Sequence, residues 1–437
     1  MREQGFSMSL WMSKSRIIIT CAKGIPPFLK EEVLSLGLPI LSEGIADVET
    51  DGTMVDAIKL NIFLRTGQRI LFLLEEFDAK RPDELYEKMS RIKWEDYIPE
   101  DGYLCVTSSV ETPTIKDSRF ANLKCKDAIV DRMNEKCGRR PDSGPKRDKT
   151  VIHLYWKGEQ CQLYLDTSGE PLSRRGYRRI PLRAPMQETL AAAVILATGW
   201  KGNGNFINPM CGSGTLAIEA AMIALNKAPG LLRNNYGFMH LKGFDQSSWK
   251  ALRKKATAVA KKSLKGKIIA TDISKEAIEA AKKNATTAGV AHLMEFGVCD
   301  YLETPVPGGG GVVMLNPEYG ERLGKIEELK EIYKGIGDFF KKRCQEYRGY
   351  IFTPHPVKTC SSRQGYRGAS EYLPQRNRRV LTRGTGFTGN LDLAKKVGLK
   401  TKRRIPFFNS NIECRLLEYD LYEGSRKRQA PSSKPRT

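Results

Sequence analysis

Residues 316–319, Asn-Pro-Glu-Tyr, follow a glycine-rich, apolar run and combine an amide, a proline and an aromatic ring. The Asn316 side-chain oxygen and the Pro317 main-chain oxygen can each accept one N–H hydrogen bond from the exocyclic amine of a nucleic-acid base. The lone pair of that nitrogen is delocalised into the base, so two such bonds are needed to direct it toward a methyl donor. Tyr319 can stack on the base and hold it out of its helix. The spacing therefore predicts methylation of an exocyclic amine, in which Asn316, Pro317 and Tyr319 act through orientation and electrostatics.

A second segment, NFINPMCGSGTLAIEAA, places a glycine loop between an apolar strand and an alanine-rich helix. Such a loop lets a ligand approach the backbone and the start of the helix closely. Ile218-Glu219 replaces the third glycine of a dinucleotide fingerprint, and the Gly-Lys-Ser/Thr of a phosphate-binding loop is absent. The loop therefore predicts a nucleoside-like ligand without a pyrophosphate. The residues predicted to hold this ligand are Asn208, Pro209, Cys211, Gly212, Ser213, Gly214 and Thr215.

Two acids follow the next apolar segments. Asp272 comes directly after GKIIAT, where a carboxylate can accept both hydroxyls of a ribose. Asp300 ends LMEFGVCD and could bond an adenine amino group. Each acid alone could equally be a helix cap or a turn residue, but three such signals in order favour a binding site. Because Asp272 lies much further from the glycine loop than the usual interval of about 20 residues, we expect the lysine-rich residues 227–266 to be an insertion.

The elements that position these residues fall into two parts. Strand and helix patterns up to Asp166 predict a small α+β domain, and 167–185 form an arginine-dense connector. From Met186, repeated strand–helix units predict an α/β domain with a mainly parallel sheet to about residue 423. Residues 424–437 are basic and rich in Pro and Ser, which predicts disorder.

Composition narrows the function classes. The 437 residues hold 72 Lys and Arg against 50 Asp and Glu, a net charge of +22, so a polyanion is the expected partner. No basic amphipathic helix favours a membrane surface, no apolar run is long enough to span a bilayer, and we expect no signal peptide. The ten cysteines form no C-x-x-C pair, which is typical of reduced thiols in a cytoplasmic protein. The four histidines lack metal-ligand spacing, so no metal is expected.

Arginines gather in two segments, SRRGYRRIPLRAP and RQGYRGASEYLPQRNRRVLTRG, where they alternate with tyrosines. This composition suits phosphate contacts and base stacking, although an ordinary solvated surface would explain any one of these residues. The predicted RNA-binding residues are Arg174, Arg175, Arg178, Arg179, Arg363 and Arg367.

The motifs NPMCGSGT, TDIS and NPEYGERLG resemble S-adenosylmethionine-dependent amino-methyltransferases with an N-P-P-Y signature. KDAIVDRM, RRGYR, NPMCGSGTLAIEAA and GNLDLAKKVGLKTKRRIPFFNSNIECRLLEYDLYEG resemble, more narrowly, the THUMP-containing large-subunit ribosomal RNA guanine-N2 methyltransferases. This likeness covers residues 17–423.

That resemblance implies a ferredoxin-like segment over 1–55, a THUMP domain over 56–166 that binds RNA, and a Rossmann-like domain over 186–423. It also implies that the glycine loop and Asp272 bind S-adenosylmethionine, with Asp300 near its adenine. Asn316, Pro317 and Tyr319 would hold a guanine of large-subunit ribosomal RNA or its precursor particle.

Glu318 departs from the N-P-P-Y signature, because a second proline would stiffen the turn that a glutamate leaves free to flex. Its carboxylate could face solvent or accept hydrogen bonds from the guanine edge.

Three alternative functions stay open: a transfer-RNA guanine-N2 methyltransferase, an adenine-N6 methyltransferase, and an RNA-binding factor whose transferase half is inactive.

Overall fold

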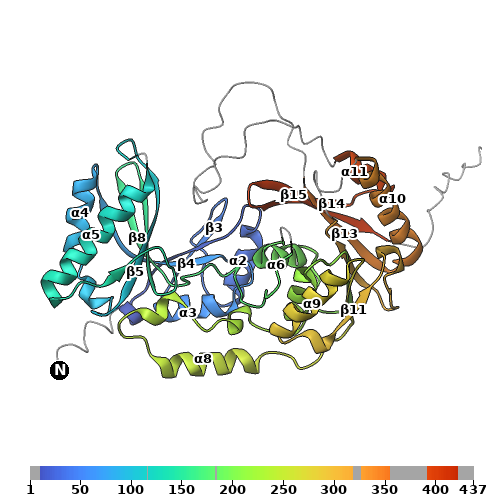
Figure 1. Ribbon diagram of the computed structural model, residues 1–437, viewed down its shortest axis with the longest axis horizontal. Helices are drawn as coiled ribbons and strands as arrows, with labels where there is room; N and C mark the ends of the chain where they lie inside the picture. Colours follow the sequence, from blue (N-terminus) through green and yellow to red (C-terminus); the bar gives the residue numbers. More distant parts are fainter. Residues whose placement is uncertain (1–9, 116, 183–184, 318–325, 355–390, 422–437) are drawn as a thin grey trace, which may run out of the picture.

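The computed structural model describes residues 10–115, 117–182, 185–317, 326–354 and 391–421. These residues form two β-sheets that lie side by side, with helices packed against both (Figure 1). Residues 318–325 and 355–390, which include Glu318, Tyr319, Arg363 and Arg367, lie outside the described residues, as does the predicted tail.

The first sheet has the strand order β2-β3-β1-β4-β8-β7-β5-β6, and its pairs are antiparallel except that β5 runs parallel to β6 and β7. Strand β4 pairs with β1 on one side and with β8 on the other, so it joins the two halves of this module. Its ladder with β8 shifts register between Leu73 and Glu75. The strands are β1 (Ser15–Thr20), β2 (Ser42–Glu43), β3 (Asp47–Gly52), β4 (Arg69–Asp78), β5 (Tyr103–Glu111), β6 (Asp142–Ser143), β7 (Thr150–Lys157) and β8 (Gln160–Asp166).

Four helices accompany this sheet, and their ends follow capping rules. The helix α3 begins after Thr53, which forms a reciprocal capping box with Asp56. The helix α5 ends at Gly138, whose φ of 66° is the left-handed conformation that favours glycine. The helices are α2 (Pro26–Ser35), α3 (Met54–Phe63), α4 (Pro82–Arg91) and α5 (Ser118–Cys137), of which α4 and α5 lie side by side.

The second sheet has the order β11-β10-β9-β12-β13-β15-β14, with five parallel strands and β15 antiparallel to both of its neighbours. The chain leaves β9 toward β10 on one side and reaches β12 on the other, so the strand order reverses between β9 and β12. The strands are β9 (Asn205–Pro209), β10 (Ile268–Asp272), β11 (Met294–Val298), β12 (Gly311–Leu315), β13 (Tyr347–Pro354), β14 (Arg403–Asn409) and β15 (Ile412–Asp420). This arrangement confirms the predicted Rossmann-like domain.

The central strands β9, β10 and β12 of the second sheet are buried on both faces, which explains their apolar sequences. Phe206 of β9 packs into the core formed with α6, α7 and α9, whereas the next residue, Ile207, packs with α10 and α11 on the other face. The helices are α6 (Glu188–Ala197), α7 (Thr215–Ala224), α9 (Lys275–Thr287), α10 (Ile326–Arg343) and α11 (Leu391–Lys396). In the described ranges, no helix is long and apolar enough to cross a membrane.

Residues 227–266 form an insertion between α7 and β10 that reaches the first module. It contains two short 3-10 helices, η2 (Pro229–Leu232) and η3 (Gly237–His240), and the helix α8 (Gln246–Ala258). The N–H of Phe238 donates to the Thr167 carbonyl at 3.1 Å, and the N–H of Lys242 donates to the Tyr97 carbonyl at 2.9 Å. These backbone hydrogen bonds connect the first module to the domain that contains the second sheet.

Candidate active site

The segments predicted to do chemistry meet at the carboxyl edge of the second sheet. The glycine loop leaves β9, Asp272 is the last residue of β10, Asp300 follows β11, and Asn316 and Pro317 follow β12. Parallel strands end at the same edge, and ligands of open α/β sheets bind where the strand order reverses. Here that place lies between β9 and β12, the strands that carry the glycine loop and Asn316.

The glycine loop needs its glycines for conformation and for space. Gly212 and Gly214 have φ values of 54° and 83°, in the left-handed region. A Cβ on Gly214 would lie 2.9 Å from the Ala281 Cβ of α9, so this glycine lets the loop approach that helix. A Cβ on Gly212 would meet no described atom within 4 Å, so the loop is open on this side. The loop therefore offers accessible backbone to a ligand.

Asp272 fixes this loop from the neighbouring strand. Its carboxylate accepts a hydrogen bond from the Gly212 N–H at 2.9 Å and another from the Ser274 N–H at 3.0 Å. A carboxylate offers about four acceptor positions, so about two remain for a ligand's hydroxyl groups. Burial, with a contribution from the nearby Asp272, raises the pKa of Cys211, which therefore stays a neutral thiol.

In the structure, Asp300 caps a short helix, which is one of the two roles that the sequence allowed for it. Its carboxylate accepts from the Leu302 N–H at 2.9 Å and caps the short helix η5 (Tyr301–Glu303). Near it lie the exposed apolar side chains of Ile273, Val298 and Leu302, which were not among the predicted site residues; Ile273 is 73% exposed. The sequence could have indicated Ile273, because this apolar residue directly follows Asp272 at the end of a strand. Exposed apolar groups beside a polar edge suit the flat face of a base.

Asn316 carries a buried amide oxygen that has no hydrogen-bond partner among the described residues. An unpaired buried acceptor costs about 1–3 kcal/mol, so it needs an explanation. Asn208 lies on the adjacent strand, where the β9–β12 ladder stops at Ile207 and Val313, and its amide nitrogen donates to the Met314 carbonyl at 2.8 Å. Asn208 therefore bridges the strands where they separate, and its own side-chain oxygen, like that of Asn316, is buried without a partner among the described residues.

The prediction that Arg175 contacts RNA is wrong. Its side chain is only 2% exposed; its Nε donates to Glu219 of α7 at 2.8 Å, and its Nη2 donates to the Arg65 carbonyl at 2.6 Å. Burial raises the pKa of Glu219, and Arg175 opposes this shift. The arginine is buried because α7 carries a carboxylate inside the core, and it joins α7 to the first module.

Arg178 is partly buried, and its role as an RNA contact stays a prediction. Its side chain is 14% exposed and pairs with Glu188 at 3.2 Å, while its Nη2 donates to the Met186 carbonyl and, at 3.3 Å, to Thr215. It ties the start of α6 to the first residue of α7. Arg174 and Arg179 are exposed and stay predicted RNA contacts, although Arg174 also pairs with Glu170 at 2.6 Å.

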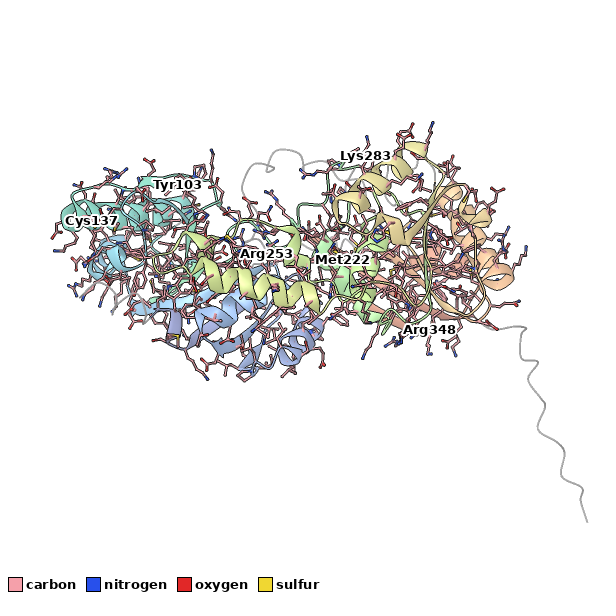
Figure 2. All side chains as sticks on the ribbon, turned by 90° about the horizontal axis from the view of Figure 1, so that it is seen from below. Tyr103, Cys137, Met222, Arg253, Lys283 and Arg348 are labelled. Atoms are coloured by element: carbon pink, nitrogen blue, oxygen red, sulfur yellow. The ribbon has the colours of Figure 1, made fainter. Side chains whose placement is uncertain are left out.

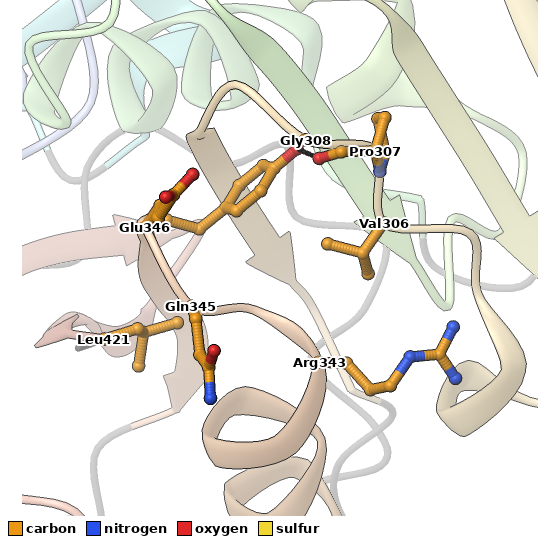
Figure 3. A pocket seen from close by; sticks show the side chains of 8 residues that line it. Val306, Pro307, Gly308, Arg343, Gln345, Glu346 and Leu421 are labelled. Carbon is orange, nitrogen blue, oxygen red and sulfur yellow. Dashed lines mark hydrogen bonds between the residues drawn. The ribbon is translucent and has the colours of Figure 1, made fainter. Parts of the chain in front are cut away.

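A cavity of about 420 Å³ lies at the opposite edge of the sheet, before the first residues of β12 and β13 (Figure 3). Val306, Pro307, Arg343 and Glu346 line it, and none of the strand-end residues described above does. The cavity is therefore separate from the candidate active site. In the part of the chain that the structure describes, no group of His, Cys, Asp and Glu could hold a metal ion.

Three family models match successive parts of the chain. The RlmL ferredoxin-like domain matches residues 16–71, the THUMP domain matches 79–166, and the RMKL-like methyltransferase domain matches 175–371. These ranges place α3 with the ferredoxin-like domain, whereas the predicted boundary between the two modules lies between residues 55 and 56. Our domain boundaries stay predictions, while the order of the modules is confirmed.

Known proteins share this whole arrangement. The chain is 33% identical over 432 residues to a ribosomal RNA large subunit methyltransferase K/L of Syntrophotalea carbinolica, covering 96% of this chain and 56% of the relative. The chain thus spans little more than half the length of that relative. A putative RNA methyltransferase of Synechocystis is 29% identical over 92% of this chain and 96% of its own.

Among solved structures, a putative methyltransferase in complex with S-adenosylhomocysteine is 25% identical and superposes with a TM-score of 0.77, over 95% of this chain and 99% of its own. It therefore shares both modules and not the methyltransferase half alone. Family models, relatives and structure agree on the same order of domains. The chain is thus similar, over nearly its whole length, to THUMP-domain proteins that carry an RMKL-like methyltransferase domain.

Proposed function

We propose that this protein transfers a methyl group from S-adenosylmethionine to the exocyclic N2 of a guanine in large-subunit ribosomal RNA. The observation that carries the proposal is the unpartnered Asn316 oxygen, buried at the carboxyl end of β12. An exocyclic amine supplies the N–H that this acceptor lacks. The name of the relative from Syntrophotalea carbinolica, a large-subunit ribosomal RNA methyltransferase, supports the choice of RNA.

The residues at the ends of β9 and β10 fit the methyl donor. The open side of Gly212 admits a ligand to the backbone, and the free acceptor positions of Asp272 suit two ribose hydroxyls. The exposed Ile273 can cover one face of the adenine, and Asp300 lies near its amino group in this proposal. When bound, S-adenosylmethionine supplies an electrophilic methyl group on sulfur. The solved relative in complex with S-adenosylhomocysteine supports this donor.

The residues after β12 fit the methyl acceptor. The Asn316 oxygen and the Pro317 carbonyl each accept one N–H bond from the guanine amine, which orients the nitrogen lone pair. Orientation of this kind accounts for much of catalysis when a weak nucleophile must meet its partner in one geometry. Tyr319 stays the predicted stacking residue, and Glu318 stays a predicted solvent-facing substitution.

The remaining parts of the chain fit an RNA substrate. The THUMP domain, the net charge of +22 and the exposed Arg174 and Arg179 suit binding of a long polyanion. We place the protein in the cytoplasm, acting on ribosomal RNA or its precursor particle, because the cysteines in the described ranges are free thiols.

Mass spectrometry of nucleosides tests the proposal. A deletion strain should lose one N2-methylguanosine from large-subunit ribosomal RNA, and plasmid-borne wild-type protein should restore it. Loss from transfer RNA instead would establish the transfer-RNA alternative, and loss of N6-methyladenosine would establish the adenine alternative. No change in any modified nucleoside would contradict the assignment of an activity.

A further inference from the structure

The insertion helix α8 and the residues that follow it carry charge of one sign only. Every charged residue from Gln246 to Lys267 is a lysine or an arginine. The preceding acid, Asp245, caps the helix by accepting from the Ser247 and Ser248 N–H groups. By contrast, the neighbouring helix α9 mixes Lys275, Lys282 and Lys283 with Glu276 and Glu279. Mixed signs are the usual composition of a solvated helix, so the composition of α8 needs another explanation.

The structure separates the cations of α8 by role. Trp249 and Ala256 are buried, and Arg253 turns inward, where its guanidinium donates to the carbonyls of Arg233 and Leu231 and lies over the Trp249 ring. The lysines from Lys250 to Lys265 are exposed, and none of them lies within ion-pair distance of a described carboxylate. The last lysine of the run, Lys267, pairs with Glu295 at 2.9 Å and is left out of the set. We call these residues the lysine face: Lys250, Lys254, Lys255, Lys261, Lys262 and Lys265.

The lysine face lies on the far side of the molecule from the candidate active site. The segment enters after α7 and returns before β10, and the Lys261 N–H donates to the Leu225 carbonyl at the end of α7 at 2.7 Å. These are the amino ends of the parallel strands, opposite Asn316 and Asp272. Figure 2 looks at this side, with α8 in front carrying the labelled Arg253.

We propose that the lysine face is a second RNA-binding surface, which holds the phosphate backbone of a duplex segment distant from the methylated base. The inference rests on the proposed function for the identity of the polyanion. Unpaired lysines are flexible point charges that suit phosphate contact without sequence readout. The face lacks the apolar stripe of a membrane-binding helix, since Val259 is its one large exposed apolar side chain among the described residues.

This placement extends the footprint of the RNA over two sides of the protein. A short hairpin that fills only the carboxyl edge would leave the lysine face empty, whereas folded ribosomal RNA has further duplexes that can reach it. The lysine face should therefore contribute to the affinity for long or structured RNA and not to the geometry of methyl transfer.

The experiment compares two full-length variants with equal loss of charge. The test variant carries Lys250→Gln, Lys254→Gln, Lys261→Gln and Lys262→Gln. The control carries Lys282→Gln, Lys283→Gln, Lys341→Gln and Lys342→Gln, four exposed lysines on α9 and α10. The probe is an RNA duplex of about 16 base pairs and arbitrary sequence, the span of a double-stranded RNA-binding domain. Binding is followed by fluorescence anisotropy over a series of salt concentrations.

The test variant should bind the duplex about tenfold more weakly near physiological salt, with a salt slope shallower by about 2 to 4. The control should keep the wild-type slope within about one unit. Equal effects of both variants, or no effect of the test variant, would overturn the proposal. If the test variant instead lost binding to anionic phospholipid vesicles and kept binding to the duplex, the partner of the lysine face would be a membrane surface and not RNA. Because the duplex carries no target guanine, this outcome is independent of whether the chain methylates RNA.

Discussion

Replacing Asp272 by alanine removes a carboxylate at the carboxyl edge of the second sheet, in the proposed donor site. The side chain holds the Gly212 N–H at 2.9 Å and the Ser274 N–H at 3.0 Å, and its other acceptor positions are available to a ribose. Hydrogen bonds to charged groups contribute about 1.5–3 kcal/mol. Loss of one such contribution should weaken binding of S-adenosylhomocysteine by about 10- to 150-fold.

Asp272→Asn separates the role of charge from that of shape. One oxygen becomes an NH₂ group, which cannot accept the backbone bond that the second carboxylate oxygen now accepts. The asparagine variant should therefore lose nearly as much affinity as the alanine variant. Glu279→Ala is the matched control, because Glu279 is an exposed acid on α9 with the same charge and should leave the affinity unchanged.

Isothermal titration calorimetry with S-adenosylhomocysteine measures the effect, and circular dichroism confirms that each variant is folded. An unchanged affinity in a folded Asp272→Ala protein would remove Asp272 from the donor site. An equal loss in Glu279→Ala would show that the affinity responds to net charge and not to the two bonds at the end of β10.

Three further outcomes follow from described contacts. Asn316→Ala should nearly abolish transfer of labelled methyl to ribosomal RNA while S-adenosylhomocysteine affinity stays within about twofold, because the lost acceptor orients the nucleophile and not the donor. Arg175→Met should lower the free energy of unfolding in urea by about 3–5 kcal/mol, since it leaves the buried Glu219 carboxyl without its basic partner, whereas Arg174→Met in an exposed pair should change it by about 0–1 kcal/mol. Burial lowers the pKa of His153 to about 3, below its unfolded value, so protonation favours the unfolded chain as pH falls. Unfolding free energy should decrease by up to about 1.4 kcal/mol per pH unit below pH ~6, and His153→Gln, which cannot titrate, should show a smaller pH dependence.

The sequence predicted the candidate site best where a residue able to bind a ligand directly follows an apolar strand. Asp272 and Asn316 each follow a buried run of β-branched or aliphatic residues, and the carboxyl ends of parallel strands meet at one edge. The proximity of Asp272 and Asn316 could therefore be predicted from the sequence alone. The sequence also indicated that residues 227–266 are an insertion, from the long interval before Asp272. It did not indicate that this insertion contacts Tyr97 and Thr167 of the first module.

The arginines of the connector could not be sorted from sequence. Arg174 and Arg175 are neighbours with the same chemistry, yet one is exposed and the other is buried against Glu219, 44 positions further along the chain. A carboxylate inside the apolar helix α7 was the available signal, because a buried acid usually has a basic partner. Which of the five connector arginines fills that role depends on how the connector crosses α7, and this is tertiary information.

The buried pair also explains how the two modules act together. Arg175 donates hydrogen bonds to the Arg65 carbonyl in the first module and to Glu219 in α7, and α7 begins directly after the glycine loop. On the other side, the insertion bonds Tyr97 and Thr167. Because of these two sets of hydrogen bonds, the position of the THUMP domain relative to Asn316 is set by tertiary contacts and not by a flexible linker. Under the proposed function, an RNA bound by the first module would present its target base at a fixed distance from Asn316. We therefore expect shape and distance, more than base contacts at the candidate active site, to select the target base.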